Sequence, residues 1–225
     1  MVPVMSVKRE LIKGTLILAA AGFAARLLGF FNRVYLANLI SNAELGRYQL
    51  IFPIFMFCMA VSCAGIQVAV SKMVAAYHGA GKKKAIRQTI KSAGIMSLIA
   101  ALLSSGCVIA FSEPISRWIL KDISCRGYLV IMAIAIPFAA VHTCVGGYFY
   151  GIRHTAVPAV TQLLEQVVRV VTIYLLGAMM YQKGKIDASV AVWGLAAGEI
   201  FSCFLTWICY RFSIRSQSGG SGSGE

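Results

Sequence analysis

Residues 22–33 read Gly-Phe-Ala-Ala-Arg-Leu-Leu-Gly-Phe-Phe-Asn-Arg and lie inside the first long apolar run of the chain. In a helix one face would carry both glycines and both arginines, because they follow an i, i+4, i+7, i+11 spacing: Gly22, Arg26, Gly29 and Arg33. A charge inside a bilayer is costly and usually faces a bundle interior or a water-filled cavity. Either these arginines line a cavity that accepts an anion, or they snorkel or pair with acids on neighbouring helices.

Composition indicates a polytopic helical membrane protein. Hydrophobic residues make up 59% of the 225 residues and charged residues 13%, with a mean hydropathy of +0.77. This apolar share exceeds that of a soluble domain. The apolar segments are long enough to cross a membrane at about 20 residues per helix. We expect an all-α bundle of six transmembrane helices at approximately 11–39, 46–75, 88–111, 128–151, 158–181 and 189–211, with a bend at Pro53 in the second.

Basic residues predict the orientation of the bundle. Residues 78–91 form a basic hairpin between the second and third spans, and cytoplasmic loops carry the excess of Lys and Arg. We therefore expect both termini in the cytoplasm and the hairpin against anionic lipid headgroups, through Lys82, Lys83, Lys84 and Arg87. Topology explains the net charge of +13, so no nucleic-acid partner is expected.

The fifth span carries a polar stripe. Four polar side chains share one helix face, and the order Glu165 then Arg169 favours an i, i+4 ion pair: Gln162, Glu165, Gln166 and Arg169. At 1.5 Å per residue, Arg169 lies about 16 Å from the start of this span, near mid-membrane. A polar stripe at this depth should face protein or water.

The sixth span combines a small-residue pattern with an acid. Gly194-x-x-x-Gly198 permits close helix approach, and Glu199 follows at once. If Glu165 neutralises Arg169, then Glu199 can neutralise only one arginine of the first span. One positive charge would then remain for an anion such as a diphosphate, to which arginine offers a planar fork of donors.

Patterns typical of enzymes and of metal sites are missing from the sequence. Paired carboxylates, a nucleophile with its base, and Cys-x-x-Cys pairs do not occur at workable spacing, so we expect no enzyme activity, metal or cofactor. Coupling to H⁺ or Na⁺ stays open. His142 lies within the fourth span, where a neutral histidine hydrogen-bonded between helices is favoured over a titrating one.

Six short motifs, in order over roughly residues 8–211, resemble the polysaccharide-exporter branch of the multidrug/oligosaccharidyl-lipid/polysaccharide flippase superfamily, the branch of the stage V sporulation proteins. The motifs are Leu11-Ile-Lys-Gly-Thr15, Arg26-Leu-Leu-Gly-Phe30, Leu45-Gly-x-Tyr-Gln49-x-x-x-Pro53, Ala64-Gly-Ile66 with Val70-Ser-Lys72, Gly147-Tyr-Phe-x-Gly151 and Gln162-x-x-Glu-Gln-Val-Val-Arg169. Gln67 departs from the pattern, since proline is expected there.

The resemblance implies a fold and a transport activity. Family members have two six-helix lobes around a central cavity and expose it to alternate sides, so that a lipid-linked saccharide crosses the membrane. By position, Arg26 matches an arginine that lines this cavity in lipid II flippase relatives, and Arg33 matches less closely. Residues 1–215 would then be an N-terminal lobe, needing a C-terminal lobe or a second copy, and residues 216–225 a flexible, non-native Gly/Ser linker.

We therefore expect a flippase of the bacterial cell membrane for an undecaprenyl-diphosphate-linked precursor of peptidoglycan or another polysaccharide, with Glu165, Arg169 and Glu199 setting the charge of the cavity. Two alternatives stay open. One is a cation/drug antiporter of the same superfamily, and the other is a non-transporting scaffold for cell-envelope synthesis.

Overall fold

The computed structural model describes residues 4–181 and 186–219, where every regular element is a helix. Two elements, η1 and η2, are single π-helical turns. In chain order the elements are α1 (Val4–Leu39), α2 (Asn42–Met59), η1 (Ala60–Ala64), α3 (Gly65–Gly79), α4 (Lys83–Ala110), α5 (Ser112–Pro114), η2 (Ile115–Ile119), α6 (Cys125–Gly151), α7 (Ala156–Tyr181) and α8 (Ser189–Gly219).

Six stretches of the described chain are long and apolar enough to cross a membrane, which confirms the predicted number of spans. They are Gly14–Leu39, Asn42–Gly79, Lys83–Ala110, Cys125–Gly151, Ala156–Tyr181 and Ser189–Arg215. Helices α1, α4 and α8 extend beyond the predicted limits, because backbone hydrogen bonding continues past the apolar run into polar residues. Of the predicted Gly/Ser tail, residues 216–219 continue α8, and residues 220–225 lie outside the described part.

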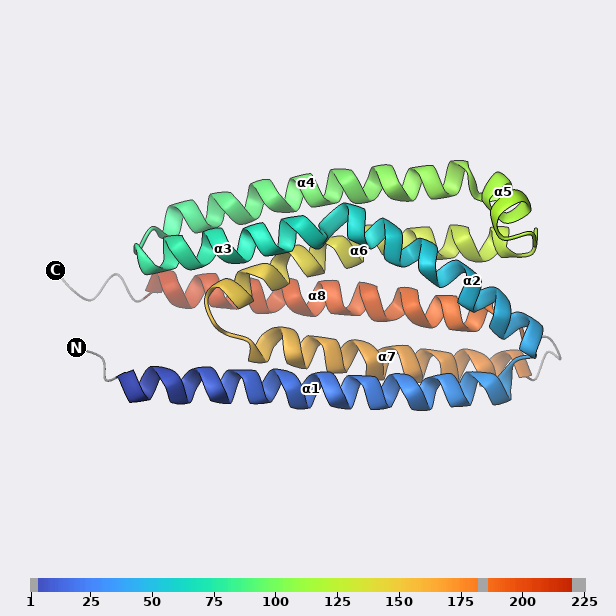
Figure 1. The fold of residues 1–225 in the computed structure, drawn as a ribbon, viewed down its shortest axis with the longest axis horizontal. Helices are drawn as coiled ribbons and strands as arrows, with labels where there is room; N and C mark the ends of the chain where they lie inside the picture. The colour runs from blue at the N-terminus through green and yellow to red at the C-terminus, as the bar shows by residue number, and fades with distance from the viewer. Residues whose placement is uncertain (1–3, 182–185, 220–225) are drawn as a thin grey trace.

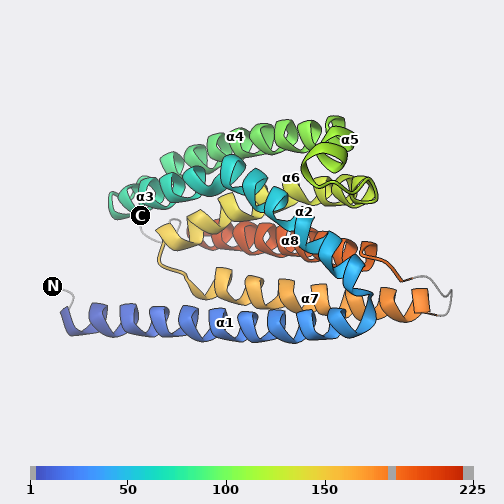
Figure 2. The same cartoon turned by 45° about the vertical axis from the view of Figure 1, so that its right-hand side comes forward.

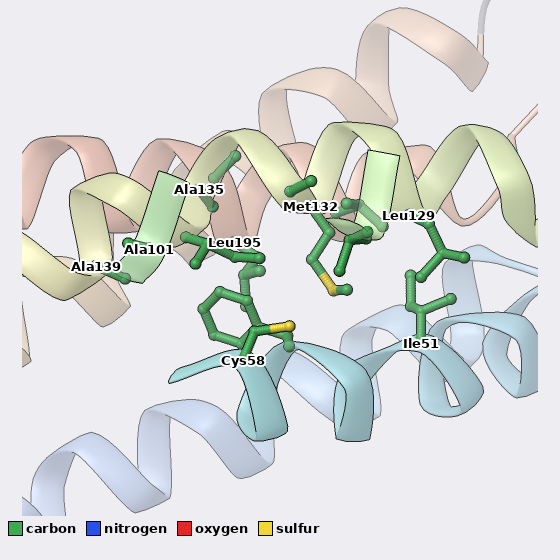
Figure 3. Packing of buried hydrophobic residues seen from close by; sticks show 14 of the residues in the cluster. Ile51, Cys58, Ala101, Leu129, Met132, Ala135, Ala139 and Leu195 are labelled. Atoms are coloured by element: carbon green, nitrogen blue, oxygen red, sulfur yellow. The ribbon is translucent and has the colours of Figure 1, made fainter. Parts of the chain in front are cut away.

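Helix α6 is the centre of the bundle. It packs against α8, α4, α3 and α2, while α1 packs mainly on α7 at the other side (Figures 1 and 2). In α6, 56% of the most apolar window is buried, against 12% in α1. Small side chains on α6 allow this close packing. Figure 3 shows Ala135 and Ala139 of α6 near Cys58 of α2 and Leu195 of α8.

The second span bends at a π turn and not at Pro53. Helix α2 begins with a cap, since the Ser41 side chain accepts a hydrogen bond from the Glu44 backbone N–H. After Met59 the chain makes the π turn η1, and α3 then continues in a different direction from α2 (Figure 1). The Ser62 carbonyl accepts a 3.3 Å hydrogen bond from the Ser97 hydroxyl. Insertions into the i→i−4 ladder are a recognised cause of sharp bends.

Different turns and contacts close the two ends of the bundle. Both termini and the α3–α4 turn lie at one end, and α5 with η2 lies at the other (Figure 1). The α3–α4 turn needs Gly81, whose φ of 67° is costly for other residues. At the far end, Arg47 of α2 pairs with Glu44 and with Asp122. The Tyr128 hydroxyl and the Ala188 backbone N–H both donate to Glu44, so this acid connects α2, α6 and the start of α8.

Candidate functional site: a charged seam between two cavities

Glycines of α8 bring α7 and α8 into direct contact. A Cβ on Gly198 would lie 3.1 Å from the Glu165 carbonyl oxygen, and a Cβ on Gly194 would overlap the Ile173 side chain. The predicted close approach at Gly194-x-x-x-Gly198 is therefore confirmed. It places Glu199, the residue after Gly198, beside the polar stripe of α7.

The result is a buried cluster of charges, the α7–α8 seam, formed by Glu165, Arg169 and Glu199. Arg169 Nη2 donates to Glu165 Oε1 at 2.8 Å and lies 3.5 Å from Glu199 Oε1. The predicted i, i+4 pair is confirmed. The expectation that Glu199 would remain for an arginine of the first span is wrong, because the α7–α8 contact turns this acid toward Arg169.

His142 of α6 completes the cluster. Its Nδ1 lies 3.4 Å from Glu199 Oε2, and one ligand atom each from His142, Glu165 and Glu199 lie within 4.8 Å of one another. With a neutral imidazole, two carboxylates and one guanidinium leave one negative charge. A proton or a monovalent cation would neutralise that charge. Arg169 competes for the same carboxylates, so its positive charge disfavours a divalent metal here.

On one side of the seam lies the α1–α2–α7 cavity, of about 480 Å³. Its walls bring together four predicted site residues, Gly29, Arg33, Gln166 and Arg169. Tyr48 of α2 lines the same cavity and adds a hydroxyl to its wall. The remaining lining residues are Asn32, Leu36, Leu45, Gln49, Phe52 and Pro53.

Sequence reasoning missed the polar contribution of α2 and of Asn32 to this cavity. Tyr48 and Gln49 belong to one of the quoted motifs but carry no charge, so nothing in their spacing singled them out. Asn32 is buried, and its Oδ1 makes no hydrogen bond to any described residue. Such an acceptor would be satisfied by a donor from water or from a ligand in the cavity.

On the other side of the seam lies a smaller cavity, the α6–α7 cavity, of about 190 Å³. The predicted α7 stripe is divided between the two spaces: Gln162 and Glu165 line this one, and Gln166 and Arg169 line the other. The Glu165–Arg169 pair therefore joins the two cavities. The other lining residues are Gln67, His142, Thr143, Gly146, Phe149, Tyr150, Pro158, Thr161 and Thr206.

The glycine and arginine stripe of α1 is only partly gathered into the site. The buried face of α1 runs through Ala21, Ala25, Asn32 and Leu36, one position away from the stripe. Gly22 and Arg26 do not line the α1–α2–α7 cavity, and Arg26 is exposed. Cβ atoms on Gly22 and Gly29 would meet nothing within 4 Å in the described structure, so this face of α1 is open.

The predicted headgroup-binding residues lie together at the α3–α4 turn. Lys82 immediately precedes α4, and the first two turns of α4 carry Lys83, Lys84 and Arg87. All four residues are exposed. The turn lies at the same end of the molecule as both termini (Figure 1). This end is therefore strongly positive.

Solved structures define the class to which this fold belongs. A MATE crystal structure in the bent conformation superimposes with a TM-score of 0.86 over 99% of this chain and 49% of that chain, at 12% identity. A MOP superfamily transporter from Pyrococcus furiosus matches with a TM-score of 0.71 at 15% identity, over 90% of this chain and 45% of that one. The fold is that of one lobe of a MATE-like membrane transporter.

The chain belongs to the polysaccharide biosynthesis protein family, whose family model matches residues 11–220. It is 28% identical to stage V sporulation protein B of Bacillus subtilis over 206 residues, which are 91% of this chain and 40% of that protein. It is 24% identical over 182 residues to the lipid II flippase MurJ of the same organism, covering 75% of this chain and 32% of the flippase. These matches confirm the resemblance to the flippase superfamily, and the chain spans less than half the length of either relative.

Proposed function

We propose that this chain forms one lobe of a transporter that carries a lipid-linked saccharide across a bacterial membrane. The observation that carries the proposal is the α1–α2–α7 cavity, where Arg33 and Arg169 present two guanidiniums beside Tyr48, Gln49 and Gln166. Guanidinium groups hydrogen-bond phosphate oxygens in a bidentate manner, so the cavity suits the diphosphate of a lipid carrier. One similar protein is itself named a lipid II flippase.

The open face of α1 belongs to the same proposal. Arg26 lies two turns before Arg33 on that face, where the described chain provides no covering helix. The chain covers 49% of the MATE chain that it resembles. A second lobe, or a second copy, would close the cavity and add Arg26 to its wall. Parallel repeats around an axis along the membrane normal are a common transporter design.

Arg169 also provides a route for ion coupling. An anion in the α1–α2–α7 cavity competes with Glu165 and Glu199 for the same guanidinium. When the guanidinium turns to the anion, the two carboxylates and His142 are left with a larger negative charge, and they bind H⁺ or Na⁺ more tightly. Because such coupling is reciprocal, the bound cation also strengthens anion binding. Proton uptake on anion binding, measured in weakly buffered solution without Na⁺, tests this step, and proton release would contradict it.

The proposal is tested by flipping of a lipid-linked precursor in cells that carry the full-length protein. Arg33→Gln should reduce the precursor reaching the outer leaflet at least about tenfold, since a charge-assisted phosphate contact contributes about 1.5–3 kcal/mol. Arg33→Lys should retain part of the flux, and Arg153→Gln, an exposed cation in the α6–α7 loop, should retain all of it. Unchanged flipping with lost drug efflux would indicate an antiporter. Loss of stability alone would indicate a scaffold.

A further inference from the structure

A groove of about 510 Å³ runs between α3 and α4, on the side of the bundle away from α1 and α7 (Figure 1). From the α3–α4 turn inward, α3 lines this α3–α4 groove with Tyr77, Met73 and Ile66. Helix α4 lines it with Gln88, Ser92 and Met96. Small side chains between them, among them Ala69 and Ala93, leave the hollow. The groove is separate from both cavities of the proposed transport site.

The length of the groove corresponds to one leaflet of a bilayer. Tyr77 and Ile66 are eleven residues apart on α3, which is about 16 Å along a helix at 1.5 Å per residue. The hydrocarbon core of a bilayer is about 30 Å thick, so half of it is about 15 Å. The groove therefore starts near the membrane surface, below the α3–α4 turn, and ends close to the middle of the membrane.

Polarity along the groove follows that of a phospholipid. The half nearer to the turn contains the hydroxyl and amide groups of Tyr77, Gln88 and Thr89, and Ser92 lies near the middle of the groove. The deeper half contains the apolar side chains of Ile66 and Met96. Hydrogen-bond donors thus lie at the depth of ester groups, and apolar surface lies at the depth of an acyl chain.

Two lysines of α4 flank the groove: Lys84 lies beside its polar end, and Lys91 lies two turns further along α4, where a side chain that tilts toward the helix N-terminus can reach back toward the membrane surface. Lys84 shares a helix face with Gln88 and Ser92 at i, i+4 and i+8, and Lys91 follows Gln88 by three residues. Both lysines are exposed, and neither forms an ion pair with any residue in the described ranges. Residues 45–112 contain no Asp or Glu, so the lysine charge is not neutralised from either helix of the groove.

We propose that the α3–α4 groove is a binding site for an anionic phospholipid of the leaflet on the side of the two termini. The phosphate lies at Lys84 and Lys91, and one acyl chain lies along the hollow between Ala69 and Ala93. Charge complementarity favours this occupant. A second copy of the chain would instead bring two basic hairpins together, and that repulsion opposes docking.

Native mass spectrometry of the whole chain, released from micelles doped with dioleoyl phosphatidylglycerol or dioleoyl phosphatidylcholine, tests the site. The unchanged chain should retain phosphatidylglycerol at least about tenfold better, because each lysine near a surface contributes about 1 kcal/mol to anionic-lipid binding. The pair K84Q/K91Q should lose this preference. R153Q/R211Q removes two exposed cations, from the α6–α7 loop and from α8, neither of which lines the groove, and should keep this preference.

A groove-filling variant separates a lipid site from a charged surface. Ala69→Phe places a ring in the hollow without changing charge, so retention of phosphatidylglycerol should fall about tenfold while the melting temperature changes little. The proposal is overturned if Ala69→Phe retains the lipid as well as the unchanged chain does. It is also overturned if R153Q/R211Q lowers the preference as much as K84Q/K91Q, or if both lipids are retained equally.

Discussion

The arginine stripe of α1 and the α7–α8 seam combine the same residue types, glycine and arginine on helix faces, yet they end in opposite environments. In the seam, a Cβ on Gly198 would press on Glu165, and Arg169 is held by two carboxylates. On α1, a Cβ on Gly22 would meet nothing within 4 Å, and residues 11–43 contain no acid. Two carboxylates hold Arg169 at the edge of the cavity, whereas Arg33 on the open face forms no ion pair with a described residue.

The largest expected difference between the two regions is the change in the free energy of unfolding when the guanidinium is removed. Arg169→Gln should lower the free energy of unfolding by about 3–5 kcal/mol, because it leaves Glu165 and Glu199 buried without a counterion. Arg33→Gln should change it by less than about 0.5 kcal/mol, because Arg33 is exposed. Chemical denaturation in one detergent measures both.

A triple variant provides the control for the seam. Adding Glu165→Gln and Glu199→Gln to Arg169→Gln removes the two uncompensated charges and should recover most of the lost stability. If the triple variant is as unstable as Arg169→Gln alone, packing and not charge explains the loss.

The next largest effect concerns the glycines, where substitution by alanine should change stability in opposite directions in the two regions. Gly194→Ala should destabilise the protein by about 1–3 kcal/mol, because the added Cβ overlaps Ile173 of α7. Gly22→Ala should stabilise it by up to about 1 kcal/mol, because alanine favours a helix and the position is open. Thermal melting of the two variants compares them directly, and equal losses would contradict an open α1 face.

Sequence reasoning predicted only part of the seam. Hydropathy predicts the six spans, and the spacing of Glu165 and Arg169 predicts their pair, because both signals lie within one segment. The contacts of Arg169 with Glu199, and of Glu199 with His142, depend on how three helices pack, which no local spacing records. For the same reason helix spacing alone does not distinguish Arg26 from Arg33, although of the two only Arg33 lines the cavity.

The smallest expected effect lies at the α5–α6 loop, where an ion pair is accessible to water. A hydrogen bond from the Arg47 guanidinium and another from the Ser124 backbone N–H hold the pKa of Asp122 below its usual value. A carboxyl with a lowered folded-state pKa adds stability above its unfolded pKa and loses it as the pH falls further. Asp122→Asn should therefore lower the free energy of unfolding by less than about 1 kcal/mol at neutral pH. It should also reduce the loss of stability that the unchanged chain shows below about pH 4. Melting curves between pH 3 and pH 7 check this, and an unchanged acid limb would contradict it.

The account depends most on the α1–α2–α7 cavity as an anion site. The most direct measurement is the dissociation constant of this chain for farnesyl diphosphate, a short prenyl diphosphate, with Arg33→Gln beside Arg153→Gln as its control. We predict that Arg33→Gln weakens binding at least about tenfold and that Arg153→Gln leaves it unchanged. Equal affinity in the unchanged chain and in Arg33→Gln would contradict the account.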